Sequence, residues 1–273
     1  MRRLALVALL GLIAAPAAAD ILTGITALGR GDYAAAYREF LPDAEQGDAF
    51  AQFTLGDLYA NGLGVAQDYS QAVKWYRRAA DQGVAEAQVA LAFIYANGRG
   101  VARDDAEAAK WYRRVAEQGD PDAQFSLGVH YREGLGVAQD YAEAVKWFRL
   151  AADQGNAMAQ YNLGVIYADG QGVPLDYIEA VEWYRRAADR GLVEAQLDLG
   201  AIYADGQGVA RDYVQAHKWL DLAAARAVDD ETRDKSVATR DIVARLMTPA
   251  QIAEAQALAR EWQPRDEPAD VPP

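Results

Sequence analysis

The stretch AQFTLGDLYANGLGVAQDYSQAVKWYRRAADQG, residues 51–83, returns four more times along the chain with modest changes. Its tryptophan, Trp75, has counterparts at steps of 36 residues, at Trp111, Trp147, Trp183 and Trp219. A constant period of this length is typical of a solenoid, in which each unit has an apolar face that only its neighbour covers. The fold is therefore predicted from columns of equivalent residues.

Each unit is predicted to contain two helices. In the first unit Ala51, Leu55 and Leu58 have helical spacing and fall on one face of the first helix. A loop with two glycines at 61–65 ends that helix, and Asp68 with Gln71 three residues later matches a capping box at the start of the second. The apolar face of the second helix is made of Ala72, Trp75, Tyr76, Ala79 and Ala80.

One position in the middle of the first helix is restricted to very small residues. It holds Gly56, Ala92, Gly128, Gly164 and Gly200. Because glycine costs about 1 kcal/mol relative to alanine inside a helix, this restriction predicts a close helix crossing. We expect a larger side chain at this position to disrupt the packing.

These residues resemble a known family. The pattern Ala51-Gln52-x-x-Leu55-Gly56-x-x-Tyr59-x-x-Gly62-x-Gly64-Val65-x-x-Asp68, followed by Ala72, Trp75-Tyr76, Ala79-Ala80 and Gly83, is similar to the Sel1-like repeat, a relative of the tetratricopeptide repeat. The resemblance implies an all-α fold, a right-handed α-α superhelix with helical caps. It is built from five repeats, at 48–83, 84–119, 120–155, 156–191 and 192–227.

The two ends of the chain depart from the period. Residues 1–19 have an arginine pair, an apolar run and small residues, which indicates a cleaved signal peptide and a periplasmic protein without stable membrane insertion. Residues 20–47 resemble a degenerate half-repeat that closes the amino-terminal end. Two helices, near 230–246 and 249–262, are expected to form a cap within residues 228–263. The proline-rich and charged tail, 264–273, is expected to be disordered.

Composition limits the possible partners and chemistry. The net charge of −13 disfavours nucleic acid and anionic lipid as partners and favours a basic or neutral protein. No cysteine is present, which excludes disulfides and thiolate chemistry. The two histidines, His130 and His217, lie in aliphatic columns more than two periods apart, so we expect packing roles and no metal or cofactor. No serine lies in a catalytic motif.

A basic ladder follows the second helices. It includes Arg77, Arg113, Arg149 and Arg185, each with an acidic residue four positions later. This spacing predicts i, i+4 ion pairs on a solvated outer face. The alternative is a docking ridge for an acidic partner.

The candidate binding surface lies on the first helices, because these line the concave groove in the related tetratricopeptide superhelix. The candidates are Phe50, Phe53, Asp57, Phe93, Phe125, Val129, Arg132, Met158, Tyr161 and Val165. The column that starts at Phe53 is always apolar, which fits either helix packing or recognition. The column that starts at Asp57 varies from acid to aromatic to aliphatic, and we interpret it as unneeded for stacking and available for a peptide or partner helix.

The sequence therefore predicts a non-enzymatic, monomeric scaffold that binds a peptide or partner protein in its groove. The resemblance implies a role in the bacterial envelope or in signalling. Two alternatives stay open at this point. One is an envelope hydrolase or a peptidoglycan- or β-lactam-binding protein, which requires a deep pocket with convergent polar groups. The other is a self-associating array, which requires exposed apolar ends.

Overall fold

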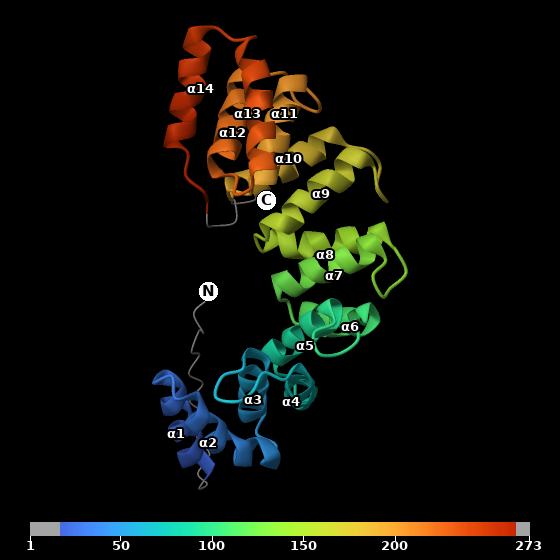
Figure 1. The fold of residues 1–273 in the computed structure, drawn as a ribbon. Helices are drawn as coiled ribbons and strands as arrows, with labels where there is room; N and C mark the ends of the chain where they lie inside the picture. The colour runs from blue at the N-terminus through green and yellow to red at the C-terminus, as the bar shows by residue number, and fades with distance from the viewer. Residues whose placement is uncertain (1–16, 266–273) are drawn as a thin grey trace. The chain divides into compact units, whose positions relative to one another are not determined.

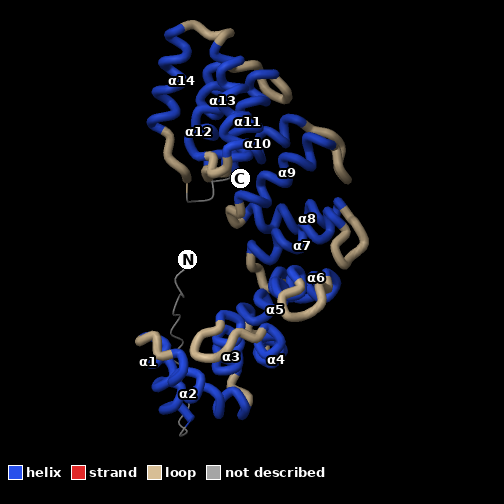
Figure 2. Tube along the Cα trace, in the orientation of Figure 1, coloured by secondary structure: helices blue, strands red, loops and turns tan. Residues whose placement is uncertain are grey.

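The computed structural model describes residues 17–265, and among them it contains fourteen α-helices and no β-strand (Figures 1 and 2). The helices are α1 (Ala17–Gly29), α2 (Tyr33–Gln46), α3 (Ala49–Asn61), α4 (Tyr69–Asp81), α5 (Ala85–Asn97), α6 (Asp105–Ala116), α7 (Pro121–Glu133), α8 (Tyr141–Asp153), α9 (Ala157–Asp169), α10 (Tyr177–Asp189), α11 (Val193–Asp205), α12 (Tyr213–Arg226), α13 (Asp230–Ala244) and α14 (Pro249–Glu261). The predicted all-α fold is confirmed. The predicted signal peptide lies outside the described residues except for 17–19, and the predicted disordered tail does so except for 264 and 265.

The chain forms two compact units, each of which is described by itself. The first unit extends to Trp111 and contains the hairpins α1–α2 and α3–α4, followed by α5. The second begins at Tyr112, inside α6, and contains the hairpins α7–α8, α9–α10 and α11–α12, followed by α13 and α14. Within each unit a second helix packs against its own first helix and against the first helix of the next hairpin.

The second helices begin where the capping aspartates predict. The Asp68 carboxylate accepts hydrogen bonds from the backbone amides of Ser70 (2.9 Å) and Gln71 (3.1 Å), which satisfies two of the four free amides of the first turn. In a capping box the side chain three residues after the cap also bonds back to the cap's backbone amide. In two repeats this side chain instead binds the tryptophan. Glu107 and Glu179, three residues after their aspartates, accept hydrogen bonds from the indole nitrogens of Trp111 and Trp183.

The two glycines of the loop have different roles. Gly62 ends α3 with a left-handed backbone, φ 65°, that glycine adopts without strain. The second loop glycine instead allows close contact with the preceding repeat. A Cβ atom on Gly100 would lie 2.2 Å from the Cβ of Tyr69, at the start of α4. This loop position therefore belongs to the contact between repeats.

The small-residue column marks the crossing point of the two helices in each hairpin. A Cβ atom on Gly56 would lie 2.5 Å from the Tyr76 ring, and one on Gly164 would lie 2.8 Å from the Tyr184 ring. Gly128 faces Phe148 and Gly200 faces Leu220 in the same way. The interpretation of this column as a packing position is supported, because a side chain here would occupy the space of the facing residue.

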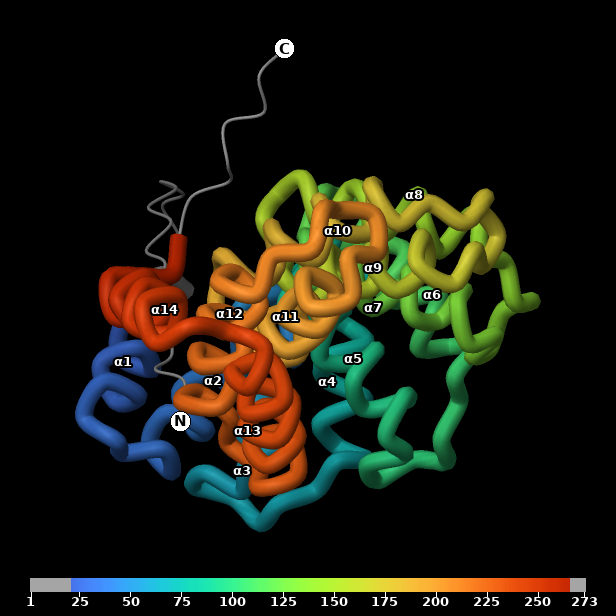
Figure 3. The backbone as a smooth tube through the Cα atoms, turned by 90° about the horizontal axis from the view of Figure 1, so that it is seen from above, coloured from blue at the N-terminus to red at the C-terminus, as the bar shows by residue number. Residues whose placement is uncertain are grey.

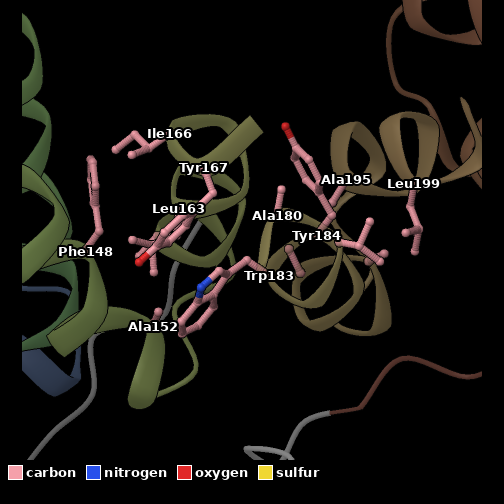
Figure 4. Close-up of a cluster of buried hydrophobic side chains, with 14 of the residues drawn as sticks. Phe148, Ala152, Leu163, Ile166, Tyr167, Ala180, Trp183, Tyr184, Ala195 and Leu199 are labelled. Atoms are coloured by element: carbon pink, nitrogen blue, oxygen red, sulfur yellow. The ribbon is translucent and has the colours of Figure 1, made fainter. Parts of the chain in front are cut away.

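The tryptophans are part of the core. Trp111, Trp147, Trp183 and Trp219 are 2–6% exposed, whereas Trp75 is half-buried. Figure 4 shows Trp183 among the buried side chains of α8, α9 and α10, close to Ala152. The same cluster contains the alanines at which the backbones approach one another. Four of the five repeat indoles are therefore buried within the stack, as expected for a solenoid.

A column of buried glutamines joins each hairpin to the next. The members, Gln52, Gln88, Gln124, Gln160 and Gln196, are at most 4% exposed. Each Nε2 donates to a carbonyl in the last turn of the preceding second helix, at 3.0–3.1 Å. Each of these carbonyls also accepts the backbone amide three residues later, as Ala80 does from Gly83, so the glutamine adds a second hydrogen bond that connects one hairpin to the next. The sequence pattern contained these glutamines but did not reveal this role.

The amino-terminal end is a complete hairpin instead of the predicted half-repeat. The loop between α1 and α2 covers only residues 30–32, whereas residues 62–68 join α3 to α4. The shorter loop moves the crossing glycine to Gly24, where a Cβ atom would lie 2.8 Å from the Phe40 ring. Phe40 occupies the position that Tyr76 has in the first repeat. The shift in register is the reason that periodicity did not detect α1.

The last two helices both pack against α12. Arg240 of α13 donates to Asp221 at 2.8 Å, and Asp221 stands where the earlier repeats have the ladder arginine. Trp262, directly after α14, contacts Trp219 edge to face at 6.3 Å. α13 and α14 thus contact different sides of α12, and Figure 3 shows them running in different directions. Helix α14 begins with a capping box formed by Thr248 and Gln251.

We expect Gly164→Val to lower the free energy of unfolding by about 1–3 kcal/mol, because the added methyl groups would overlap the Tyr184 ring. Urea unfolding followed by far-UV circular dichroism measures this change. The control is Gly29→Ala, at the end of α1, where no atom lies within 4 Å of the added Cβ. If the two variants were equally stable, the close crossing would not limit this position.

We expect Gln124→Leu to destabilise the protein by about 1–3 kcal/mol, because it removes two hydrogen bonds, the one from Gln124 to the Ala116 carbonyl and the one from Gln154 to the Gln124 side-chain oxygen. The same substitution at Gln160 should cost less. There the side-chain oxygen has no hydrogen-bond partner in the native state, since Arg190 replaces the glutamine that would supply it. Unfolding midpoints in urea compare the two variants, and equal losses would contradict this account.

Candidate functional site

The ten predicted binding residues all lie on first helices, and they fall into two sets. In the first unit, Phe50, Phe53 and Asp57 lie on α3 and Phe93 lies on α5. In the second unit, Phe125, Val129 and Arg132 lie on α7, and Met158, Tyr161 and Val165 lie on α9. We call the columns that contain these residues the first-helix face of each unit.

Three of the candidates are large apolar side chains exposed to solvent. Phe50 is 45% exposed, and Phe93 and Met158 are each 44% exposed. The Arg99 guanidinium lies 4.8 Å from the centre of the Phe93 ring, which leaves the ring fixed but accessible. Val89, 38% exposed, is one helical turn before Phe93 on α5. Exposed aromatic and methionine side chains are the residue types enriched at protein interfaces.

The column that starts at Phe53 takes part in packing within each hairpin. The ring centre of Phe53 lies 5.9 Å from that of Tyr76, and the corresponding distances are 5.8 Å for Phe125 and Phe148 and 5.6 Å for Tyr161 and Tyr184. All three first-helix rings are half-buried. Packing against the second helix therefore accounts for the apolar character of this column, and one side of each ring faces outward.

At Asp57 the prediction that its column is unneeded for stacking is wrong. The Asp57 carboxylate accepts a hydrogen bond of 2.6 Å from the Tyr76 hydroxyl of α4. Burial raises the pKa of Asp57 above its ordinary value, and the tyrosine bond opposes that shift. Asp57 is therefore a link between the two helices of its hairpin. Phe93, Val129 and Val165 replace it in the next repeats, and only Phe93 among them is strongly exposed.

The second unit contains polar residues on this face that the sequence did not single out. The Tyr161 hydroxyl donates to Asp198 of α11 at 3.0 Å, and Arg132 of α7 donates to Asn162 of α9. Burial raises the pKa of Asp198. These bonds connect successive first helices. The sequence did contain a signal for these bonds in the column that includes Asn162 and Asp198. This column holds the small residues Thr54, Ala90 and Ser126 in the first three repeats and larger polar residues in the last two.

The basic ladder on the second helices forms contacts between repeats. Arg77 donates to the Tyr95 hydroxyl at 2.6 Å and Arg185 donates to the Tyr203 hydroxyl at 2.6 Å. Arg113 and Arg149 make the same bond to Tyr131 and Tyr167. The main partner of each arginine is thus the first helix of the next repeat, instead of the predicted acid four residues later. The ladder is structural along its length.

Both histidines are buried. His130 is 5% exposed, and its Nδ1 lies 2.8 Å from the Leu135 carbonyl oxygen. His217 is 3% exposed, and its Nδ1 has no hydrogen-bond partner. Residues 17–265 contain no group of three or more side chains suited to hold a metal ion. Within the same residues, no helix combines the length and apolarity needed to cross a membrane.

An open cleft of about 610 Å³ lies between α12, α13 and α14. Half of its lining residues are alanine or aliphatic, and the others are Asp221, Arg233, Arg240, Gln256 and Arg260. Arg240 is paired with Asp221 and Arg233 is paired with Asp230. One ion pair thus joins α13 to α12 and the other lies within α13, and the lining lacks the pairing of an acid and a base around a nucleophile.

Comparison with known proteins agrees with this architecture. The family model of the Sel1 repeat matches residues 49–84, 85–120, 121–156, 157–192 and 193–228, one residue later than the boundaries read from the sequence. No curated protein sequence matches the chain significantly. Proteins built from this repeat generally mediate protein–protein interactions, and the fold is typically that of a non-enzymatic scaffold.

Two of the solved structures that are similar to this chain illustrate the match. A Sel1 repeat protein from Oxalobacter formigenes is 32% identical, with a TM-score of 0.71 over 83% of this chain and 100% of that one. The protective antigen c5321 of uropathogenic Escherichia coli, which has the same repeat fold, is 27% identical, with a TM-score of 0.45 over 90% of this chain and 76% of that one.

The buried His217 predicts a dependence of stability on pH. Burial lowers the pKa of its imidazole below the ordinary value of 6.5. A group whose pKa is lower in the folded state stabilises that state fully above its unfolded pKa, and the contribution is lost as the pH falls below 6.5. We expect the unfolding free energy to decrease more between about pH 7 and pH 5 in the wild type than in His217→Val. Valine stands at this position in three other repeats. Identical pH profiles in urea unfolding would show that His217 does not titrate on unfolding.

Proposed function

Because the chain belongs to the Sel1 repeat family, we propose that it is a non-enzymatic scaffold that binds a partner protein on its first-helix face in the bacterial periplasm. The observation that carries this proposal is the exposure of Phe50, Phe93 and Met158, each 44–45% exposed on an otherwise well-packed helix. Phe50 also packs edge to face on Phe40, with 5.8 Å between the ring centres, but close to half of its surface still faces solvent. Large exposed apolar side chains on a rigid frame are typical anchors of protein interfaces.

The first-helix face suits recognition better than the second-helix face. On the second helices the long cationic side chains bind tyrosine hydroxyls of the neighbouring repeat, so changing them would alter the stack. On the first helices the outward positions differ from repeat to repeat. Phe50, Glu86, Asp122, Met158 and Glu194 occupy one column and are all exposed. A column free to vary can adapt to one partner without loss of the fold.

The periplasmic location rests on the amino-terminal sequence. Arg2 and Arg3 precede the apolar run of 4–15, and the small residues Ala17, Ala18 and Ala19 follow it, which is the order of an export signal. In that compartment the protein would act as an adaptor that regulates an envelope or signalling protein. The non-enzymatic role is supported by the two histidines, since His130 and His217 are both buried within helix packing.

We expect Phe93→Ala to reduce capture of the partner at least about tenfold, because truncation of an interface anchor typically costs more than 1 kcal/mol. The measurement is crosslinked capture from an envelope extract of the source bacterium, followed by quantitative mass spectrometry. The matched control is Leu150→Ala. Leu150 is 43% exposed, similar to Phe93, but lies on the second helix α8. Both variants should retain wild-type circular dichroism.

The control separates recognition from general loss of apolar surface. Partners that persist with Leu150→Ala and disappear with Phe93→Ala support the first-helix face. Equal capture by all three proteins would remove this face as the binding surface.

A further inference from the structure

Charge is distributed unequally between the two kinds of helix. The first helices of the five repeats, α3, α5, α7, α9 and α11, carry eight acidic residues and one basic residue. The acidic residues are Asp57, Glu86, Asp122, Glu133, Asp169, Glu194, Asp198 and Asp205, and the basic residue is Arg132. The second helices, α4, α6, α8, α10 and α12, instead carry more bases than acids. The negative charge of the repeats is therefore concentrated on the first helices.

Most of the bases of the second helices have a partner within the repeats. In addition to the arginine–tyrosine bonds, the Arg186 guanidinium lies 4.6 Å from the Trp183 ring centre, and the Lys218 ammonium lies 4.0 Å from the Trp219 ring centre. Side chains held in this way have little freedom to reorganise around an acidic partner. This removes the main reason to regard the basic ladder as a docking ridge.

The acids of the first helices lie beside the exposed apolar anchors. In the first unit, Phe50 and Glu86 occupy the same column of neighbouring first helices. In the second unit, Asp122, Met158 and Glu194 do the same. A hydrogen bond of 3.0 Å from the Asn156 side chain, at the start of α9, to the Asp122 carboxylate joins two of these neighbouring helices. Each unit thus presents an exposed apolar side chain next to exposed carboxylates.

We propose that the partner of the first-helix face is a basic amphipathic segment, with apolar residues that contact Phe50 or Met158 and lysine or arginine residues that pair with Glu86, Asp122 or Glu194. This inference rests on the proposed function and adds the chemistry of the partner. An acidic segment would meet repulsion on this face, and so would a second copy of a chain with a net charge of −13. Charge complementarity also raises the association rate of such a partner.

The test uses the full chain and three synthetic peptides. The first is an amphipathic peptide of leucine and lysine, the second is its leucine–glutamate counterpart, and the third has the lysine composition in an order that leaves no apolar face. Fluorescence anisotropy measures binding at low and high salt, about 0.05 M and 0.5 M, because screening weakens exposed charge pairs. We expect the first peptide to bind most tightly, and more weakly at high salt.

Matched variants separate a specific face from general attraction to an acidic protein. Glu86→Lys with Glu194→Lys reverses two exposed acids on first helices. Asp153→Lys with Glu182→Lys reverses two exposed acids on second helices and gives the same net charge. We expect the first pair to weaken binding of the amphipathic lysine peptide about tenfold at low salt and the second pair to weaken it less than about threefold. Wild-type circular dichroism confirms the fold of each variant.

A second measurement detects the contact between the first-helix carboxylates and the partner directly. In complexes captured from the envelope extract, zero-length coupling of carboxylates to amines should join Glu86 or Glu194 to lysines of the partner. Equal weakening by both charge pairs, tighter binding of the glutamate peptide, or coupling mainly at Asp153 and Glu182 would each overturn the inference. If partner capture still depended on Phe93 in such a case, the proposed function would stand and only the basic character of the partner would be wrong.

Discussion

Each hairpin of this protein has a buried surface that only the following hairpin completes. Apolar contact supplies part of that surface, as in the cluster around Trp183. Polar groups complete the rest, since the buried glutamines donate to helix-end carbonyls of the preceding repeat and the ladder arginines bind tyrosines of the next. A buried side-chain amide without an acceptor costs free energy comparable to a lost hydrogen bond. Stacking is therefore specified by polar contacts as well as by apolar area.

This constraint divides the residues of a repeat into two classes. The positions of Gly164, Trp183 and Gln160 face a neighbouring helix and tolerate few residue types, because each has a fixed space or a fixed hydrogen bond to fill. The outward positions of the first helices have no such contact, so Glu86 and Met158 can share a column. A scaffold of this kind keeps its frame constant and changes its recognition surface independently.

The first and last repeats have a neighbouring repeat on one side only, and different helices cover their other side. At the amino-terminal end, α1 and α2 repeat the close crossing with Gly24 and Phe40 on a shorter loop. At the carboxyl-terminal end, the ladder changes sign, because Asp221 replaces the arginine and pairs with Arg240 of α13. Leu222, in a column that is arginine in three other repeats, is buried against the core. These substitutions fit α12 to two helices that are not repeats.

The all-helical fold, the period, the starts of the second helices and the tight crossing at Gly56 could be predicted from the sequence, because these depend on local spacing and on columns that repeat. Contacts between helices became known only from the packed structure. Asp57 has its partner Tyr76 on the next helix, and Arg77 has its partner on the next repeat, and no periodic pattern specifies which of several nearby groups a long or polar side chain will reach. The same reason explains the missed pair of Tyr161 and Asp198. Its bond depends on the distance between two first helices, which is set by the packing of the hairpins and not by the spacing of residues within one helix.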